Sequence, residues 1–250
     1  AAAERYYRQA LRMDRDNNLA VRGLANVYRR ESPEKASAYI ASLPASQRRS
    51  IDDIERSLAN ARLEQQATAL EGQGRWAEAA AVQRQRLAAT PGDVWITYRL
   101  ASDLLSAGQR SEADAQMRAL AQQKPQDPEQ VYATGLYLSG NNQARAALAH
   151  ISTLPRERWT DNIRELDDRL RANELLASAN ALRDSGKEAE AEMLLKRQPP
   201  STRVELTLAD WAQQRGDYST AIAHYNSVLS KEADNLDARL GLTEVYLASG

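Results

Sequence analysis

Few residues of this 250-residue chain have the types and spacing that catalysis requires. Its two histidines, His150 and His224, are far apart in the sequence, and neither belongs to a metal-binding motif. Paired aspartates at 52–53 and 167–168 could serve acid–base chemistry, but adjacent residues of a helix point in different directions. The absence of cysteine excludes thiolate zinc sites and cysteine nucleophiles. The sequence therefore predicts no catalytic residue, no metal site and no cofactor, and hence a protein that is not an enzyme.

Binding chemistry has a better candidate in Trp95, Tyr98 and Ser102, which are spaced to share one face of a helix. An exposed Trp and Tyr one turn apart form a flat amphipathic surface, which suits a sugar ring or the side chain of a protein partner. The alternative interpretation is that Trp95 packs against the neighbouring helix pair. We take these three residues as the first part of a candidate binding site.

The aromatic residues belong to a 34-residue stretch, 94–127, in which apolar and small residues recur at fixed positions. Positions 7, 8, 11, 15, 20, 24, 27 and 32 are Leu100, Ala101, Leu104, Gly108, Ala113, Met117, Leu120 and Pro125. This spacing is typical of a tetratricopeptide repeat, two antiparallel helices that turn at a glycine and end at a proline. Because one pair cannot bury its apolar face alone, such pairs stack. The fold class predicted is an all-α, right-handed solenoid of antiparallel helix pairs.

The 34-residue frame is lost twice, and both segments have helical spacing of their own. Ile54 and Leu58 in the first segment correspond to Leu166 and Leu170 in the second. We interpret both as inserted, non-repeat helices that act as hinges. An alternative for the first is that it is fused into the first helix of the next repeat. The predicted segments are repeat helices at 1–44 (a partial and a shortened repeat), an inserted helix at 45–60, a repeat array at 61–155, a second inserted helix at 156–171, and a truncated repeat array at 172–250.

A second part of the candidate site comes from Arg22 and Asn26, at positions 5 and 9 of an early repeat. These two residues resemble half of the carboxylate clamp with which some chaperone-binding repeats hold a peptide C-terminus. The next regular repeat has Glu64 and Thr68 at the same positions, which departs from the clamp pattern.

Charge and hydropathy exclude two classes of partner. Formal net charge is −1, with 33 basic and 34 acidic residues interspersed, so we expect no nucleic-acid binding. There is no apolar run of about 18 residues, so the sequence predicts no membrane-embedded helix. The chain starts without a methionine or a signal segment, and we expect it to be a piece of a longer protein.

Several runs resemble one bacterial family. They are SIDDIERSLANARLEQQATALEGQGRWAEAAAVQRQRLAATPGDVWITYRLASDLLSAGQRS, DPEQVYATGLYLSG, GKEAEAEMLL and QPPSTRVELTLADWAQQRGDY. The chain is similar to the cellulose synthase operon protein C family over almost its whole length. The resemblance implies a periplasmic repeat region of a protein that is anchored in the outer membrane by a barrel. It implies other cellulose synthase complex subunits as partners, together with the cellulose chain or peptidoglycan.

The function predicted is a non-enzymatic periplasmic scaffold of cellulose synthesis and export. By protein–protein interaction, it links the synthase complex to the outer-membrane export channel. One alternative is a glycan-binding module that guides the cellulose chain through aromatic residues of its concave face. The repeat alone also suggests an intracellular scaffold that docks peptides.

Overall fold

The computed structural model describes residues 2–199 and 201–249. The protein is 82% helical, with no strand in those two ranges. Ala1, Pro200 and Gly250, which belong to the first and last segments predicted from the sequence, lie outside the described residues. Two compact units are present, one containing residues up to 143 together with 149–158, and the other containing 144–148 and the residues from 159 onwards.

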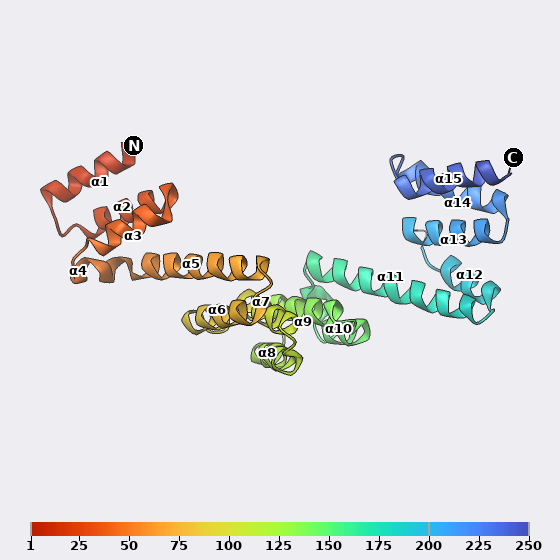
Figure 1. Ribbon diagram of the computed structural model, residues 1–250, viewed down its shortest axis with the longest axis horizontal. Coiled ribbons are helices and arrows are strands. Elements are labelled where there is room, and N and C mark those ends of the chain that lie inside the picture. Colours follow the sequence, from red (N-terminus) through yellow and green to blue (C-terminus); the bar gives the residue numbers. More distant parts are fainter. Residues whose placement is uncertain (1, 200, 250) are drawn as a thin grey trace. The chain divides into compact units, whose positions relative to one another are not determined.

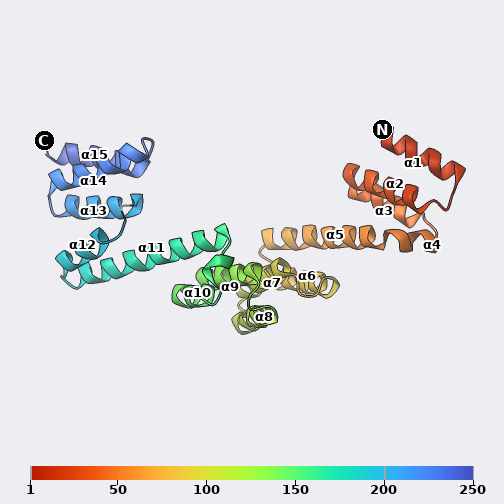
Figure 2. The same ribbon diagram turned by 180° about the vertical axis from the view of Figure 1, so that it is seen from behind.

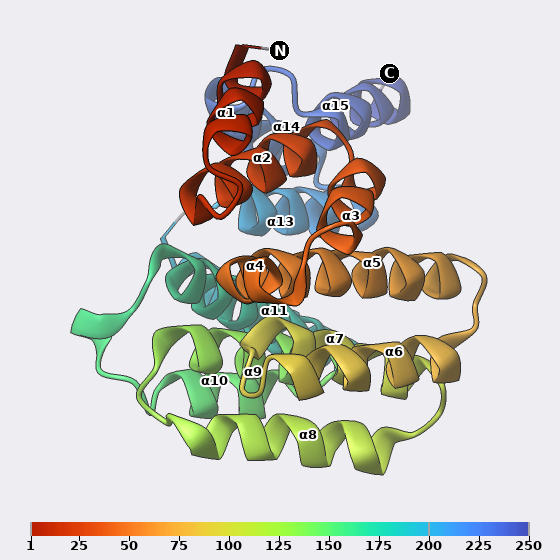
Figure 3. The same cartoon turned by 90° about the vertical axis from the view of Figure 1, so that its left-hand side faces the viewer.

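The first unit is built from antiparallel helix pairs (Figure 1). Its elements are α1 (Ala2–Met13), α2 (Asn18–Glu31), α3 (Pro33–Ala41), α4 (Ala45–Arg48), the 3-10 turn η1 (Arg49–Ile51), α5 (Asp52–Gly72), α6 (Trp76–Ala89), α7 (Val94–Ser106), α8 (Arg110–Gln123), α9 (Pro128–Gly140) and the 3-10 turn η2 (Arg156–Arg158). Helix α10 (Ala144–Ile151) contributes residues to both units. In Figure 3, α8 runs alongside α7 and α9, which are its contact partners.

The second unit repeats this organisation (Figure 2). Its elements are α11 (Asp161–Asp184), α12 (Glu188–Lys196), α13 (Thr202–Gln214), α14 (Tyr218–Lys231) and α15 (Leu236–Ser249). Helix α11 pairs with α12, and α14 lies between α13 and α15. The all-α tetratricopeptide architecture that the spacing predicts is therefore confirmed.

Capping residues explain why the first helices of the regular repeats begin where they do. The Asp93 carboxylate accepts hydrogen bonds from the backbone N–H groups of Trp95 and Ile96 at 3.0 and 2.9 Å. Asp127 has the same role at the start of α9. The turn between α7 and α8 needs a left-handed residue, and Gly108 supplies it at φ 78°.

Each of the two long helices, α5 and α11, contains part of one predicted inserted segment. The first part of α5 buries Ile54 and Leu58 in a cluster shared with α2 and α3. Its second part buries Ala67 and Leu70 in another cluster with α6. α5 and α11 continue through residues 60 and 171, where the sequence predicts boundaries. Each inserted segment thus extends the first helix of the repeat that follows, while the hinge role assigned to it stays a prediction.

Two glycines allow successive repeats to approach closely. A Cβ atom on Gly241 would lie 2.3 Å from the Tyr225 ring, and one on Gly23 would lie 2.4 Å from the Tyr7 ring. Tyr225 is fixed in place, because it is 1% exposed and its hydroxyl bonds to Asp210 and Gln213. Contact between repeats at these positions therefore requires a residue without a side chain.

We expect Gly241→Ala to overpack the α14–α15 contact and to lower the free energy of unfolding by roughly 1–3 kcal/mol. Gly72→Ala is the matched control, because a Cβ there meets nothing within 4 Å. That change should leave stability unchanged or raise it by up to about 1 kcal/mol. Urea unfolding followed by circular dichroism measures both. Equal midpoints for the two variants would contradict the close-packing argument.

Candidate functional site

The candidate site lies on α7 and α9, the first helices of two consecutive repeats. The Trp95 and Tyr98 rings meet edge to face, with centroids 5.9 Å apart. Trp95 makes a similar contact with Tyr132 of α9 at 6.0 Å. Its indole Nε1 donates a hydrogen bond to Oε1 of Glu129 at 2.7 Å. These interactions fix an indole that is still 39% exposed.

A cavity of about 400 Å³ adjoins the Tyr98 ring. We call it the α7–α9 groove, and it is lined by Tyr98, Ser102, Leu105, Ser106, Leu136, Tyr137, Gly140 and Asn141. The lining combines hydroxyl and amide groups with apolar side chains, which is the usual character of a ligand pocket. The Ser102 hydroxyl donates to the Tyr98 carbonyl at 3.0 Å, so its oxygen remains available as an acceptor.

The structure brings the predicted residues Trp95, Tyr98 and Ser102 together on one helix. Both interpretations of Trp95 describe part of its position, since the ring is partly exposed and also contacts the next repeat. Sequence reasoning missed Glu129 and Tyr132. The repeat period itself was the signal that could have found them, because they lie 34 residues after Trp95 and Tyr98.

Arg22 and Asn26 lie apart from this groove, on α2. The Arg22 guanidinium donates to both carboxylate oxygens of Asp53 on α5, at 2.7 and 2.5 Å. These hydrogen bonds hold the pKa of Asp53 below its usual value. Asn26 is half-buried. Their predicted role in a clamp for a peptide carboxylate stays a prediction, and a ligand there would compete with Asp53 for Arg22.

Glu64 and Thr68, at positions 5 and 9 of the next repeat, also form hydrogen bonds within the protein. Arg99 of α7 donates to Glu64 Oε1 and to the Thr68 hydroxyl, both at 3.3 Å, and to Glu71 Oε2 at 2.9 Å. Arg86, only 5% exposed, donates to Asn60 at 3.0 Å and lies 3.3 Å from Glu64. A polar network therefore joins α5, α6 and α7.

Asp103 is the least well satisfied member of this region. It is 3% exposed, and its Oδ2 atom has no hydrogen-bond partner. Burial, followed by repulsion from Glu71, raises the pKa of Asp103 to about 6. An ionised Asp103 is thus less stable in the folded protein than in the unfolded chain.

Among residues 2–199 and 201–249, no group of three or more His, Asp or Glu side chains could hold a metal ion. Within the same ranges, no helix has the length and apolar character needed to span a membrane. The groove offers aromatic faces, hydroxyl groups and one amide, which are suited to recognition.

Comparison with known proteins identifies the family. Residues 212–250 match the tetratricopeptide repeat family. Cellulose synthase operon protein C of Escherichia coli K12 is 69% identical over 90% of the chain, and that of Salmonella typhimurium is 66% identical over 98%. By sequence, the chain belongs to the cellulose synthase operon protein C family. It spans 19% of the E. coli relative and 24% of the Salmonella relative. Among solved structures, that of yeast Tom70 is 14% identical, with a TM-score of 0.42, over 98% of this chain and 58% of that one.

The raised pKa of Asp103 predicts a defined pH dependence of stability. Between pH 4 and 6 the folded protein retains a proton that the unfolded chain has released, so the free energy of unfolding falls as pH rises through this range. The Asn side chain of Asp103→Asn cannot ionise, so this variant should not show the decrease in the free energy of unfolding that Asp103 causes. Relative to the parent protein, it should gain on the order of 1–3 kcal/mol between pH 4 and 7.

Urea midpoints at pH 4, 5, 6 and 7 measure this difference. Asp237→Asn changes an exposed carboxylate on α15 and serves as the control. A stability difference between Asp103→Asn and the parent that stays constant with pH would show that Asp103 is ionised in the folded protein throughout.

Proposed function

We propose that this chain is part of a non-enzymatic scaffold that takes part in cellulose synthesis and export by binding other proteins. The family supports a role associated with cellulose synthesis, and the repeat architecture supports protein–protein interaction. The single observation that carries the proposal is the aromatic surface beside the α7–α9 groove, where Trp95 and Tyr98 of one repeat lie next to Tyr132 of the following repeat.

More specifically, we propose that the chain is the periplasmic part of a protein that is anchored in the outer membrane. There it links the synthase complex to the export channel, with other cellulose synthase complex subunits as partners. Stacked helix pairs suit such a task, because each added pair lengthens the surface without requiring a larger core. Aromatic residues such as Trp95 and Tyr98 suit the centre of a protein interface, where Trp and Tyr contribute most to affinity.

Site-specific photocrosslinking tests the scaffold role. A photoreactive amino acid at Tyr98 or Tyr132, in bacteria that make the whole protein, should capture other subunits of the cellulose machinery. Ala119 and Gln122 are matched controls, because both are exposed on α8. We expect several-fold more protein adduct from positions 98 and 132 than from α8. Equal yields from both sets, or no protein adduct from positions 98 and 132, would count against the proposal.

A second candidate function is glycan binding at the same groove, by stacking of a sugar ring on the aromatic side chains. The exposed part of Trp95 and the hydroxyl-bearing wall favour it, since a pyranose ring has an apolar face and a polar rim. The cellulose chain or peptidoglycan would be the ligand.

Tryptophan fluorescence tests this second candidate. If the groove binds glucan, cello-oligosaccharides should change the emission of the parent protein, and Trp95→Ala should abolish the change with helicity intact. Tyr246→Ala removes an exposed aromatic side chain on α15 and should preserve the response. An unchanged spectrum for the parent protein at millimolar oligosaccharide would remove the glycan-binding candidate for this groove.

A further inference from the structure

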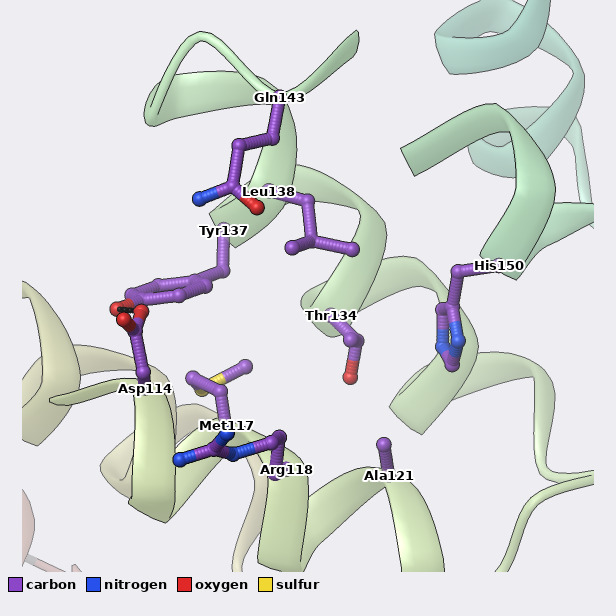
Figure 4. A pocket seen from close by; sticks show the side chains of 9 residues that line it. All are labelled: Asp114, Met117, Arg118, Ala121, Thr134, Tyr137, Leu138, Gln143 and His150. Atoms are coloured by element: carbon purple, nitrogen blue, oxygen red, sulfur yellow. Dashed lines mark hydrogen bonds between the residues drawn. The ribbon is translucent and has the colours of Figure 1, made fainter. Parts of the chain in front are cut away.

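A second cavity, of about 290 Å³, lies in the first unit between α8 and α9 (Figure 4). Met117 and Arg118 of α8 line it, with Thr134 and Tyr137 of α9 and His150 of α10. We call it the Thr134 pocket. In Figure 4, Tyr137 lies toward one end of it, and Thr134 and His150 lie toward the other.

The Thr134 hydroxyl is unusual among helical threonines of this protein. The hydroxyls of Thr97, Thr207 and Thr243 each donate to the carbonyl four residues earlier, at 2.7 to 2.8 Å. Thr134 is only 6% exposed, and its Oγ1 atom has no hydrogen-bond partner. A buried hydroxyl without a partner is unfavourable. The hydroxyl therefore has an unmet hydrogen bond, which a molecule in the pocket could satisfy only by approaching this buried atom closely.

A second unpaired polar atom lines the same pocket. Nε2 of His150 is buried and also lacks a hydrogen-bond partner. Burial lowers the pKa of His150, so the imidazole is neutral at pH 7. A neutral imidazole nitrogen donates or accepts one hydrogen bond, depending on its tautomer. The pocket thus offers two directional groups that carry no charge.

The repeat pattern shows that the pocket departs from ordinary core packing. Thr134 occupies position 7 of its repeat, where Leu24, Leu100 and Leu208 stand in three other repeats. Two further repeats have Gln66 and Ser178 there, but both of these side chains are exposed, whereas Thr134 is buried. All three leucines are buried core residues. Threonine is smaller than leucine and adds a hydroxyl. The substitution therefore opens space in the core and places a polar group there.

The remaining charged groups limit the type of ligand. The Tyr137 hydroxyl donates to Oδ1 of Asp114 at 2.6 Å, so a carboxylate lines the pocket. Arg118 follows one helical turn later and carries the opposite charge. A free anion would be repelled by Asp114, and a cation by Arg118. The balanced charges favour a neutral ligand that both donates and accepts hydrogen bonds.

We propose that the Thr134 pocket binds a single hexopyranose unit, with ring hydroxyls bonded to Thr134 and His150. A hydroxyl group is both donor and acceptor, so it can satisfy either tautomer of His150. The apolar C–H face of the ring fits Met117 and Leu138 on the pocket wall. At about 290 Å³ the pocket is several times larger than the roughly 30 Å³ that one water molecule occupies. This site shares only Tyr137 with the lining of the α7–α9 groove, and it does not depend on the proposed scaffold role.

Methionine methyl NMR provides a direct test, because the chain has three methionines. Met117 is 2% exposed in the pocket, while Met13 and Met193 are exposed elsewhere and act as internal controls. Methyl β-glucopyranoside should shift the Met117 signal alone, and the shift should saturate. Methyl β-N-acetylglucosaminide shows whether an acetylated amino sugar is accepted as well. Sorbitol, which has hydroxyls but no ring, should have no effect.

Substitutions at Thr134 separate binding from folding. Thr134→Val keeps the shape and removes the hydroxyl, so it should weaken sugar binding at least tenfold. Thr134→Leu restores the residue found at this position in other repeats, so it should abolish binding and raise the urea midpoint. Thr97→Val is the matched control, because Thr97 is equally buried and lies outside the pocket. It should leave the affinity unchanged.

Three outcomes would overturn the proposal. The first is a Met117 signal that does not respond to either glycoside, which would mean that water alone fills the pocket. The second is an equal response to sorbitol, which would show that ring shape is not recognised. The third is an unchanged affinity in Thr134→Val, which would place the sugar elsewhere.

Discussion

The structure depends on one constraint, which is that a pair of helices buries its apolar face only when another pair covers it. Each contact between consecutive repeats must therefore match in size and polarity. Tyr225 at position 24 packs on Gly241 at position 6 of the next repeat. Met117 and Ala133, which hold the same two positions in an earlier pair of repeats, belong to one core cluster. A large residue on one side requires a small residue on the other, because protein interiors leave little free volume.

A polar version of the same contact joins α6 and α7. Position 24 is Gln83, which is fully buried, and position 6 of the next repeat is Arg99. Both side chains bond to Glu71 of α5, with Gln83 Nε2 at 3.3 Å and Arg99 Nη2 at 2.9 Å from its carboxylate oxygens. Buried ionic groups require such partners, since removing one partner leaves an uncompensated charge. This contact therefore adds specificity of pairing, because a slipped register would separate Arg99 from Glu71.

The periodic part of the fold could be predicted from the sequence, because its physical causes are local. Proline and glycine positions define helix ends, and recurring Leu and Ala define buried faces. The continuity of α5 was harder to predict. Its two parts belong to different apolar clusters, and nothing in the spacing of Ile54, Leu58 and Leu63 distinguishes one long helix from two short ones. The absence of Gly and Pro between Pro44 and Gly72 was the only local sign of a continuous helix.

For the candidate site, spacing identified the helix face that carries Trp95 and Tyr98. It could not identify the Arg22–Asp53 pair, which depends on how α2 meets α5.

Residues that depart from the repeat pattern are the most informative about function. A residue that fits the pattern is already explained by its role in packing the helix pairs. Leucine at position 7 needs no functional explanation, since burial of its side chain stabilises the helix pair. Threonine at the same position loses part of that stabilisation and adds a hydroxyl whose hydrogen bond is unmade. His150 adds a second unmade bond in the same pocket. Two unfavourable groups that line one cavity are better explained by a shared ligand than by two separate packing defects. The same reasoning sets Trp95 apart from the buried Trp211, because Trp211 is 3% exposed while Trp95 presents its ring partly to solvent.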